Sequence, residues 1–396
     1  MATSKFIELD ITDLAYGGDG VGRMDGRVCF VPFTLPGERV RACLTQEAKR
    51  YARANVIAVL TPSPERIKPP CPHFRVCGGC RYQHLDYTAQ VRWKQKQVAE
   101  ILARIGGFRA QPIEPMIPSP HPYGYRNKIT LHGPGQPAFL ALNDRRPIPI
   151  ARCPLATEPI NAILREQLQR TLAEGEHLVI RSNQAGAARW FTECVGRRTA
   201  SDGKPGTLTE KVLDQSYDYP VNSFFQVNPE VLKQILTTAG IWFETFGCST
   251  LVDAYCGVGI FVLALARRNQ RGIGIEADDA TTAAAKANAA RQEASHVTFR
   301  QGRAEACLER VLRDSPADRT CLVLDPPRAG CSAPVLRTVI RHRPRHILYL
   351  SCVPPILARD LKQLVQSGYR LVRAQPFDMF PQTAHIECLA ELALMA

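Results

Sequence analysis

The sequence predicts an α/β chain in which a doubly wound sheet follows a small OB-like β-barrel and a mixed α+β middle region. Short apolar strands alternate with helical stretches from about residue 250 onward, which is the pattern of right-handed βαβ units. Residues 1 to about 60 instead alternate β-like runs with Gly-rich turns, as antiparallel barrels do. The segment between them is rich in Pro and Gly and mixes β-like pieces with one helical stretch. We therefore expect three domains, at residues 1–62, 71–212 and 213–396.

Each helix is predicted from apolar residues that recur at helical spacing. The middle region should contain helices over 87–105 and 159–173, separated by short β-like pieces near 128–131, 139–142 and 177–181. The C-terminal domain should contain helices over 260–268, 280–292, 335–341 and 356–367.

The composition describes a folded chain with a basic surface. The 396 residues include 50 Lys+Arg and 37 Asp+Glu, a formal net charge of +13. Residues 71–210 hold 19 basic and 11 acidic side chains, so this segment carries +8 of the +13. A basic surface favours nucleic acid through neutralisation of phosphates, although a solvated basic face explains the composition equally well.

The location of the chain is predicted from what the sequence lacks. No apolar run approaches the ~18 residues of a membrane span, and the first residues lack the apolar segment of a signal peptide. We therefore expect a cytoplasmic protein without a membrane partner. In that reducing compartment, the 14 cysteines should serve metal binding, catalysis or packing rather than disulfides.

The first 60 residues resemble the TRAM domain, an OB-like RNA-binding barrel. Their strand-like runs FIELDIT, RVCFVPF and YARANVIAVL surround the Gly-rich turn Tyr16–Gly22. The resemblance implies that the segment KRYAR, beginning at Lys49, supplies charge and one aromatic ring for contact with RNA.

A ligand-binding turn is predicted after the first strand of the C-terminal domain. The motif DAYCGVG places two glycines directly before a helix, where the backbone can approach a ligand closely. Glu276 ends the next strand, about 20 residues further on, and suits hydrogen bonding to ribose hydroxyls. A dinucleotide site would require a third glycine where Val262 stands, so a nicotinamide cofactor is disfavoured. The pattern is similar to that of class I methyltransferases, which bind S-adenosylmethionine.

A reactive cysteine is predicted at the same edge of the sheet. Asp325 in LDPPR and Cys352 in LSCVP each follow a strand, so both should flank one pocket. Carbon 5 of a pyrimidine is a poor nucleophile, and addition of a thiolate to carbon 6 activates it. The carbon 5 proton must then be removed by a base, and Glu387 in QTAHIE is available. The alternative for Cys352 is a buried thiol that only packs.

These motifs together resemble the RNA uracil-5 methyltransferase family, whose product is 5-methyluridine. The matching pieces are FFQVNP, DAYCGVG, LDPPRAGC, YLSC and DMFPQTAHIE. The resemblance implies that Cys352 is the nucleophile and Glu387 the base. It also implies four contacts to S-adenosylmethionine, made by Gln226, Tyr255, Glu276 and Asp325. A flipped or unpaired uridine would be needed, because a stacked base hides its reacting double bond.

Two positions depart from the family pattern. Ile260 and Val353 stand where members commonly carry Asn, so one hydrogen bond is expected to be lost at each. We expect altered cofactor affinity or local geometry rather than lost chemistry. Two rival functions remain open: a catalytically idle RNA-binding protein that kept the fold, and a cytosine-5 RNA methyltransferase, whose families place the nucleophile after Pro.

Three cysteines are spaced as metal ligands. Cys71, Cys77 and Cys80 form C-x5-C-x2-C, and a fourth ligand must lie elsewhere. Subfamilies with a TRAM domain show a similar spacing and bind a [4Fe-4S] cluster, which implies Cys153 rather than Cys194 as the fourth ligand. A zinc site and free thiols are the alternatives. The same resemblance favours 23S rRNA over tRNA as the substrate, because the tRNA relatives generally lack both barrel and cluster.

One further segment and one further residue have open roles. The segment Tyr123–Lys128 resembles a family motif that could hold the extruded base or its phosphate, or it is an ordinary strand start. His385 could orient Glu387 or simply pack.

Overall fold

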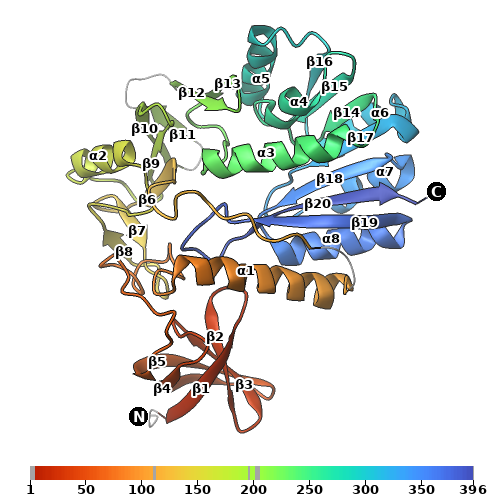
Figure 1. The fold of residues 1–396 in the computed structure, drawn as a ribbon. Coiled ribbons are helices and arrows are strands. Elements are labelled where there is room, and N and C mark those ends of the chain that lie inside the picture. The colour runs from red at the N-terminus through yellow and green to blue at the C-terminus, as the bar shows by residue number, and fades with distance from the viewer. Residues whose placement is uncertain (1–4, 110–112, 195–196, 201–205, 396) are drawn as a thin grey trace.

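The computed structural model describes residues 5–109, 113–194, 197–200 and 206–395 (Figure 1). The N-terminal segment is a closed five-stranded barrel with strand order β1-β2-β3-β5-β4. Along β1, buried Leu9 and Ile11 alternate with exposed Glu8 and Asp10, because successive side chains of a strand point to opposite faces. The strands are β1 (Phe6–Leu14), β2 (Asp19–Met24), β3 (Arg27–Pro32), β4 (Arg39–Glu47) and β5 (Tyr51–Thr61).

A long helix, α1 (Tyr87–Ile101), follows the barrel and continues into a single π-helical turn, Leu102–Gly106. The helix begins at Asp86, whose carboxylate accepts hydrogen bonds from the backbone amides of Thr88 and Ala89. In Figure 1 α1 lies between the barrel and the C-terminal sheet.

The middle region is built on a six-stranded sheet with order β11-β10-β9-β6-β7-β8. The helix α2 (Glu158–Gln167) packs against β9 and β10. It ends six residues before the expected Ala173, because Leu172 instead exchanges two backbone hydrogen bonds with Gly135. The strands are β6 (Lys128–His132), β7 (Ala138–Leu140), β8 (Pro147–Pro149), β9 (His177–Ser182), β10 (Ala188–Cys194) and β11 (Arg197–Ala200).

The C-terminal sheet has seven strands in the order β16-β15-β14-β17-β18-β20-β19. Its first five strands are parallel, and β20 runs antiparallel to both of its neighbours. The strands are β14 (Thr250–Asp253), β15 (Arg271–Glu276), β16 (Val297–Gln301), β17 (Thr320–Leu324), β18 (His346–Ser351), β19 (Tyr369–Phe377) and β20 (Glu387–Leu394). The fold is therefore the doubly wound α/β arrangement that the alternation of strands and helices predicts.

Helices cover both faces of this sheet, and a hydrophobic cluster lies on each. Trp242 of α3 belongs to the cluster on one face, whereas Leu361 of α8 and Val98 of α1 belong to the cluster on the other. Helix α4 ends at Leu265, three residues earlier than its pattern predicts. The helices are α3 (Pro229–Glu244), α4 (Ile260–Leu265), α5 (Asp279–Arg291), α6 (Ala304–Arg313), α7 (Ala333–His342) and α8 (Pro354–Gln366).

A two-stranded hairpin connects the two larger sheets. It consists of β12 (Thr207–Val212) and β13 (Gln215–Pro220). Asn288 of α5 accepts from the Asp218 amide at 2.8 Å and donates to its carbonyl at 3.0 Å. The hairpin thus spans the expected domain boundary at 212/213 and is tied to the C-terminal part.

No helix among the described residues combines the length and the apolar character needed to span a membrane.

Candidate active site

The turn after β14 forms an open cradle at the carboxyl edge of the sheet. Gly257 and Gly259 both have left-handed backbones, with φ of +55° and +91°. A Cβ added to Gly257 would meet no atom within 4 Å, so free space lies against this backbone. Glu276, at the end of β15, accepts hydrogen bonds from the amides of Gly257 at 3.1 Å and Asp278 at 2.8 Å. The structure thus brings the glycine turn and the predicted ribose-binding carboxylate together, leaving room for a ligand.

Asp253, the last residue of β14, is a buried carboxyl that the sequence analysis did not single out. One of its oxygens accepts from the Tyr255 amide at 3.3 Å, and its other oxygen has no partner among the described residues. Burial raises the pKa of Asp253 to about 8, and the charges of Asp325 and Glu276 act in the same direction. Its position as the first residue of DAYCGVG was the available signal. The cofactor side of the site therefore gathers three carboxyl groups, and the raised pKa of Asp253 keeps that group largely protonated at neutral pH.

Gln226 and Asp325 meet across the site from different parts of the chain. The Gln226 side-chain amide donates to Asp325 at 3.3 Å. The Asn127 side chain holds the Gln226 carbonyl at 3.1 Å, so the middle region positions this residue. Burial raises the pKa of Asp325 to about 7, against the opposing effect of the Gln226 hydrogen bond. Two of the predicted cofactor contacts are thus direct neighbours.

Cys352 and Glu387 lie on adjacent segments of the sheet. Cys352 directly follows β18, and Glu387 opens β20, where Ser351 pairs with Cys388. Burial raises the pKa of Cys352 to about 12, and the charge of Glu387 raises it further. Burial also raises the pKa of the Glu387 carboxyl well above its usual range, with a smaller contribution from Asp325. The predicted nucleophile and base are therefore close enough to influence each other electrostatically.

Arg328 is the positive charge of this pocket. Its guanidinium lowers the pKa of both Cys352 and Glu387, opposing the effect of burial on each. It thus favours the ionised form of both groups. In the sequence, Arg328 is only the last residue of the motif LDPPR, which gives no signal of this position.

Tyr16 enters the same pocket from the barrel. Burial and the negative charge of Cys352 raise its pKa to about 12, whereas Arg328 lowers it. Gln97 of α1 holds the turn by donating to the carbonyls of Leu14 and Ala15, both at 3.0 Å. The sequence analysis placed Tyr16 in a barrel turn and gave no signal that this residue lies near Cys352, because the two are more than 300 positions apart.

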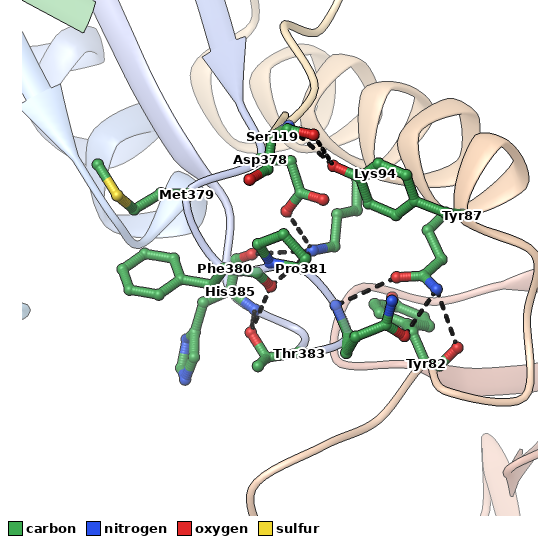
Figure 2. Close-up of polar contacts among 12 residues, drawn as sticks. Tyr82, Tyr87, Lys94, Ser119, Asp378, Met379, Phe380, Pro381, Thr383 and His385 are labelled. Carbon is green, nitrogen blue, oxygen red and sulfur yellow. Dashed lines mark hydrogen bonds and ion pairs between the residues drawn. The ribbon is translucent and has the colours of Figure 1, made fainter. Parts of the chain in front are cut away.

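The segment between β19 and β20 is held from the N-terminal side of the chain (Figure 2). The Lys94 ammonium of α1 donates to Asp378 at 2.7 Å, to the Phe380 carbonyl at 3.1 Å and to the His385 carbonyl at 3.4 Å. The Gln382 carbonyl accepts from the backbone amides of Arg81 and Tyr82. These bonds fix the stretch that leads into Glu387.

His385 and two tyrosines of the segment Tyr123–Lys128 can now be placed. His385 lies edge-on to Phe380, with ring centroids 5.7 Å apart, and burial lowers its pKa to about 4. It is therefore neutral near pH 7. The Tyr125 hydroxyl donates a hydrogen bond to the Pro381 carbonyl at 3.0 Å. Burial raises the pKa of Tyr123, and the charges of Cys80 and Cys71 act in the same direction. The aromatic residues of this motif thus support the catalytic segment and the cysteine site.

A separate cavity of about 390 Å³ is lined by Cys71, Cys77, Cys80 and Cys153. Burial raises the pKa of the Cys71, Cys77 and Cys80 thiols, and the charge of Cys153 raises each further. The exposed Cys194 lies outside this lining. Within the described ranges, no three metal-binding side chains converge as they would around a single ion. The four predicted ligands therefore line a cavity and do not converge on the position of a single ion.

The sheet order, the glycine turn and the acidic residue after the second strand together define a class I S-adenosylmethionine-dependent methyltransferase. Residues 207–393 match the family model described as tRNA (Uracil-5-)-methyltransferase, and residues 4–57 match the TRAM domain. The chain is 36% identical to an uncharacterized RNA methyltransferase of Synechocystis sp., over 96% of this chain and 94% of that protein. It is 35% identical to one from Thermosynechococcus vestitus, over 98% and 97%. The chain therefore belongs to the RNA (uracil-5) methyltransferase family, and it is an RNA methyltransferase with a TRAM domain.

One solved structure shares the whole fold. The tRNA (uracil-54, C5)-methyltransferase of Pyrococcus abyssi, in complex with S-adenosyl-L-homocysteine, superimposes with a TM-score of 0.70. The alignment covers 98% of this chain and 100% of that one at 24% identity. This likeness shows that nearly the whole chain shares its fold with that structure.

Proposed function

We propose that this enzyme methylates carbon 5 of a specific uridine in RNA, with Cys352 as nucleophile and Glu387 as base. The observation that carries this proposal is the meeting of Cys352, Glu387 and Arg328 at one sheet edge, each within electrostatic reach of the others. A thiol and a carboxyl beside one cation suit the addition and proton removal that carbon 5 chemistry requires.

S-adenosylmethionine, when bound, supplies the methyl group. Gln226, Tyr255, Glu276 and Asp325 are the proposed contacts, and three observations support them. Gly257 faces free space, and one Asp253 oxygen has no hydrogen-bond partner among the described residues. Glu276 accepts hydrogen bonds from the Gly257 and Asp278 amides and still has lone pairs that can accept others. A carboxylate with spare acceptors suits ribose hydroxyls.

The residues act in a fixed order. The Cys352 thiol gives its proton to solvent water, and Arg328 stabilises the thiolate that adds to carbon 6 of the uracil. Carbon 5 then takes the methyl group and still carries its own proton. The Glu387 carboxylate accepts that proton, carbon 6 releases the Cys352 thiolate, and 5-methyluridine is formed. Arg328 favours the ionised form of Cys352 and of Glu387.

We propose a [4Fe-4S] cluster in the cavity lined by the four cysteines, with a structural role. A zinc ion would require four sulfurs at about 2.3 Å from one point, whereas each iron of a cluster takes one thiolate. The cavity of about 390 Å³ between the cysteines supports the second arrangement. Arg126, Lys128 and Arg152 also line it, and their positive charges suit a group held by four thiolates.

Anaerobic purification tests this proposal. A brown protein with iron and sulfide in a fourfold ratio to the chain supports the cluster. A colourless preparation with one zinc per chain contradicts it. Cys80→Ser should lose the metal and weaken folding or RNA binding, and loss of the chemical step alone would contradict a structural role.

We favour 23S rRNA over tRNA as the substrate on the resemblance of the cysteine spacing alone, because the tRNA (uracil-54, C5)-methyltransferase that shares this fold is aligned over the barrel as well. We also keep the division into barrel, middle and catalytic domains as a proposal, with the hairpin β12–β13 at the second boundary.

A covalent trap tests the reaction. The anaerobically purified protein and S-adenosylmethionine are incubated with 5-fluorouridine-substituted ribosomal RNA and tRNA, and a denaturation-stable protein–RNA adduct is sought. Fluorine cannot leave as a proton, so a thiol-addition enzyme should stall. The adduct should vanish in Cys352→Ala, and its RNA fragment should identify the site. No adduct on either RNA, from protein that binds the cofactor, contradicts the proposal and favours an idle RNA-binding protein. Nucleoside analysis of the product separates uridine from cytosine methylation.

A further inference from the structure

A polar groove of about 430 Å³ lies between the barrel and the cysteine loop. The barrel contributes Phe33, Arg53 and Asn55 to its lining, and the segment around the cysteines contributes Arg75 and Arg81. Three guanidinium groups thus face one concave surface, outside the catalytic pocket. The groove takes no part in the chemistry described above, so its charge needs another explanation.

Only one of these three arginines is neutralised. Arg53 forms an ion pair with Asp19 at 3.2 Å. Neither Arg75 nor Arg81 has a carboxylate within ion-pair distance in the described part of the chain. Both guanidiniums instead stack on Phe33, at 5.6 Å and 5.7 Å from the ring centroid. The groove therefore presents two oriented positive charges that lack an anion.

The local backbone fixes this arrangement. Phe33 and Arg75 both have left-handed backbone φ values, +63° and +75°, which residues other than glycine rarely adopt. Arg66 donates to the Phe33 carbonyl at 2.9 Å, and Phe74 packs edge-on against the Phe33 ring with centroids 5.3 Å apart. Strained backbone that the surroundings hold in place is concentrated at functional sites.

The groove ends beside the catalytic segment. The Arg81 backbone amide donates to the Gln382 carbonyl at 2.8 Å, five residues before Glu387. The barrel turn also touches Arg81, because a Cβ built on Gly18 would lie 3.1 Å from the Arg81 Cβ. That turn carries Tyr16, which is close enough to Cys352 for their charges to interact. A chain lying in the groove would thus lead to the reacting cysteine.

We propose that this groove binds the phosphodiester backbone of the single-stranded RNA next to the target uridine, with Arg75 and Arg81 on its phosphates. This inference rests on the proposed function, because it assigns a path to the substrate of that same site. Planar guanidiniums match phosphate oxygens in pairs, and stacking on Phe33 orients them before RNA arrives. Because Arg75 lies between Cys71 and Cys77, order in the cysteine loop also orders this phosphate contact.

The salt dependence of RNA binding measures these contacts directly. Anisotropy of a fluorescein-labelled oligouridylate gives the slope of log K against log salt, which changes by about 0.7 for each phosphate contact to a single strand. Arg75→Gln and Arg81→Gln should each lower the slope by about 0.7, and the double variant by about 1.4. Arg75→Lys with Arg81→Lys keeps both charges, so it should keep the slope.

Arg268→Gln is the matched control, because Arg268 is an exposed arginine at the opposite edge of the C-terminal sheet. It should leave the slope unchanged. A wild-type slope in the double Gln variant overturns the proposal, and so does an equal fall in the control. Calorimetric binding of S-adenosylhomocysteine verifies that each variant is folded, and the two single variants keep the test valid should the double variant not fold.

The covalent trap separates failure of this inference from failure of the proposed function. At saturating RNA, the groove variants should form the 5-fluorouridine adduct at the wild-type rate, while half-saturation should need more RNA. Absence of the adduct in the wild type contradicts the function itself. A changed rate at saturation with unchanged affinity contradicts the groove as a binding surface.

Discussion

Lys94 of α1 and Asp378, which follows β19, form an ion pair whose side chains are both fully shielded from solvent. Their charged atoms lie 2.7 Å apart although 284 positions separate them in the sequence. The second Asp378 oxygen has no partner among the described residues, so Lys94 is the main compensation for its charge. The pair joins the N-terminal helix to the segment that carries the proposed base.

Removal of one member of this pair should destabilise the protein strongly. Lys94→Met leaves a buried carboxylate without its cation, at a cost of about 3–5 kcal/mol in the free energy of unfolding. Urea unfolding measures the change. The exposed pair Lys96–Asp13 has the same 2.7 Å separation, so Lys96→Met is the control and should cost about 0–1 kcal/mol. Lys94→Met combined with Asp378→Leu should recover much of the loss; no recovery would assign the effect to packing.

Stability should fall as the pH rises from about 4 to about 8. Burial raises the pKa of Asp253 to about 8 and that of Asp325 to about 7, so the folded state keeps protons that the unfolded state loses near pH 4. The contribution is complete below pH 4 and is lost as the pH approaches these raised values. Each group contributes a slope of roughly 1 kcal/mol per pH unit.

Asp253→Asn isolates this effect, because it removes one of the titrating carboxyls. Thermal unfolding between pH 5 and pH 8 should show a shallower decline for this variant than for the wild type. Asp318→Asn, at an exposed position, should follow the wild type. Parallel curves for Asp253→Asn and the wild type would show that Asp253 is ionised in the folded protein.

The barrel should affect chemistry through Tyr16 as well as RNA binding. Tyr16→Ala removes a ring beside Cys352, so adduct formation with 5-fluorouridine RNA should slow by roughly ten- to a hundredfold at saturating RNA. Tyr16→Phe keeps the ring and should retain most of the rate. Phe6→Ala, at an exposed aromatic residue elsewhere on the barrel, is the control. Equal rates for Tyr16→Ala and the wild type would restrict the barrel to binding.

Val353→Asn should stabilise helix α8. Val353 is the N-cap residue of this helix and supplies no side-chain hydrogen bond to it. Asn is a favoured N-cap, so the substitution should add about 1 kcal/mol to the free energy of unfolding. Val353→Ala should bring no such gain. A loss of stability in Val353→Asn would show that the valine packs against a neighbour that the amide disturbs.

Ile260 presents a different case from Val353. Its side chain is buried in the hydrophobic cluster that contains Trp242 and Phe261. The lost cofactor hydrogen bond expected there stays a prediction, and Ile260→Asn tests it through the dissociation constant of S-adenosylmethionine.

Local pattern was sufficient for the fold and for most of the cofactor edge. Period-two alternation predicts the barrel, and the motif DAYCGVG marks the glycine turn that the structure shows. Helix ends were less accurate, since Leu172 turned back to Gly135 instead of continuing α2. That exchange depends on a partner 37 positions away, which periodicity within a helix does not contain.

The contacts between distant segments could not be predicted in this way. In the sequence, Tyr16 is part of a turn, Lys94 is one charge on a helix, and Arg328 is the last residue of the motif LDPPR. Each acquires its role from a partner on another element: Cys352, Asp378 and Glu387, respectively. Only the tertiary structure reveals these pairs, because neither partner carries a local signal of the other.

The position of β20 has a consequence for biosynthesis. This last strand inserts between β18 and β19, and Glu387 stands at its start. A ribosome releases the chain from its N-terminus, so the barrel can close early while the sheet still lacks an inner strand. The reacting pocket is complete only when the final strand emerges and Asp378 meets Lys94. The proposed base therefore reaches its place last, and the sheet lacks one of its inner strands until residues 387–394 have left the ribosome.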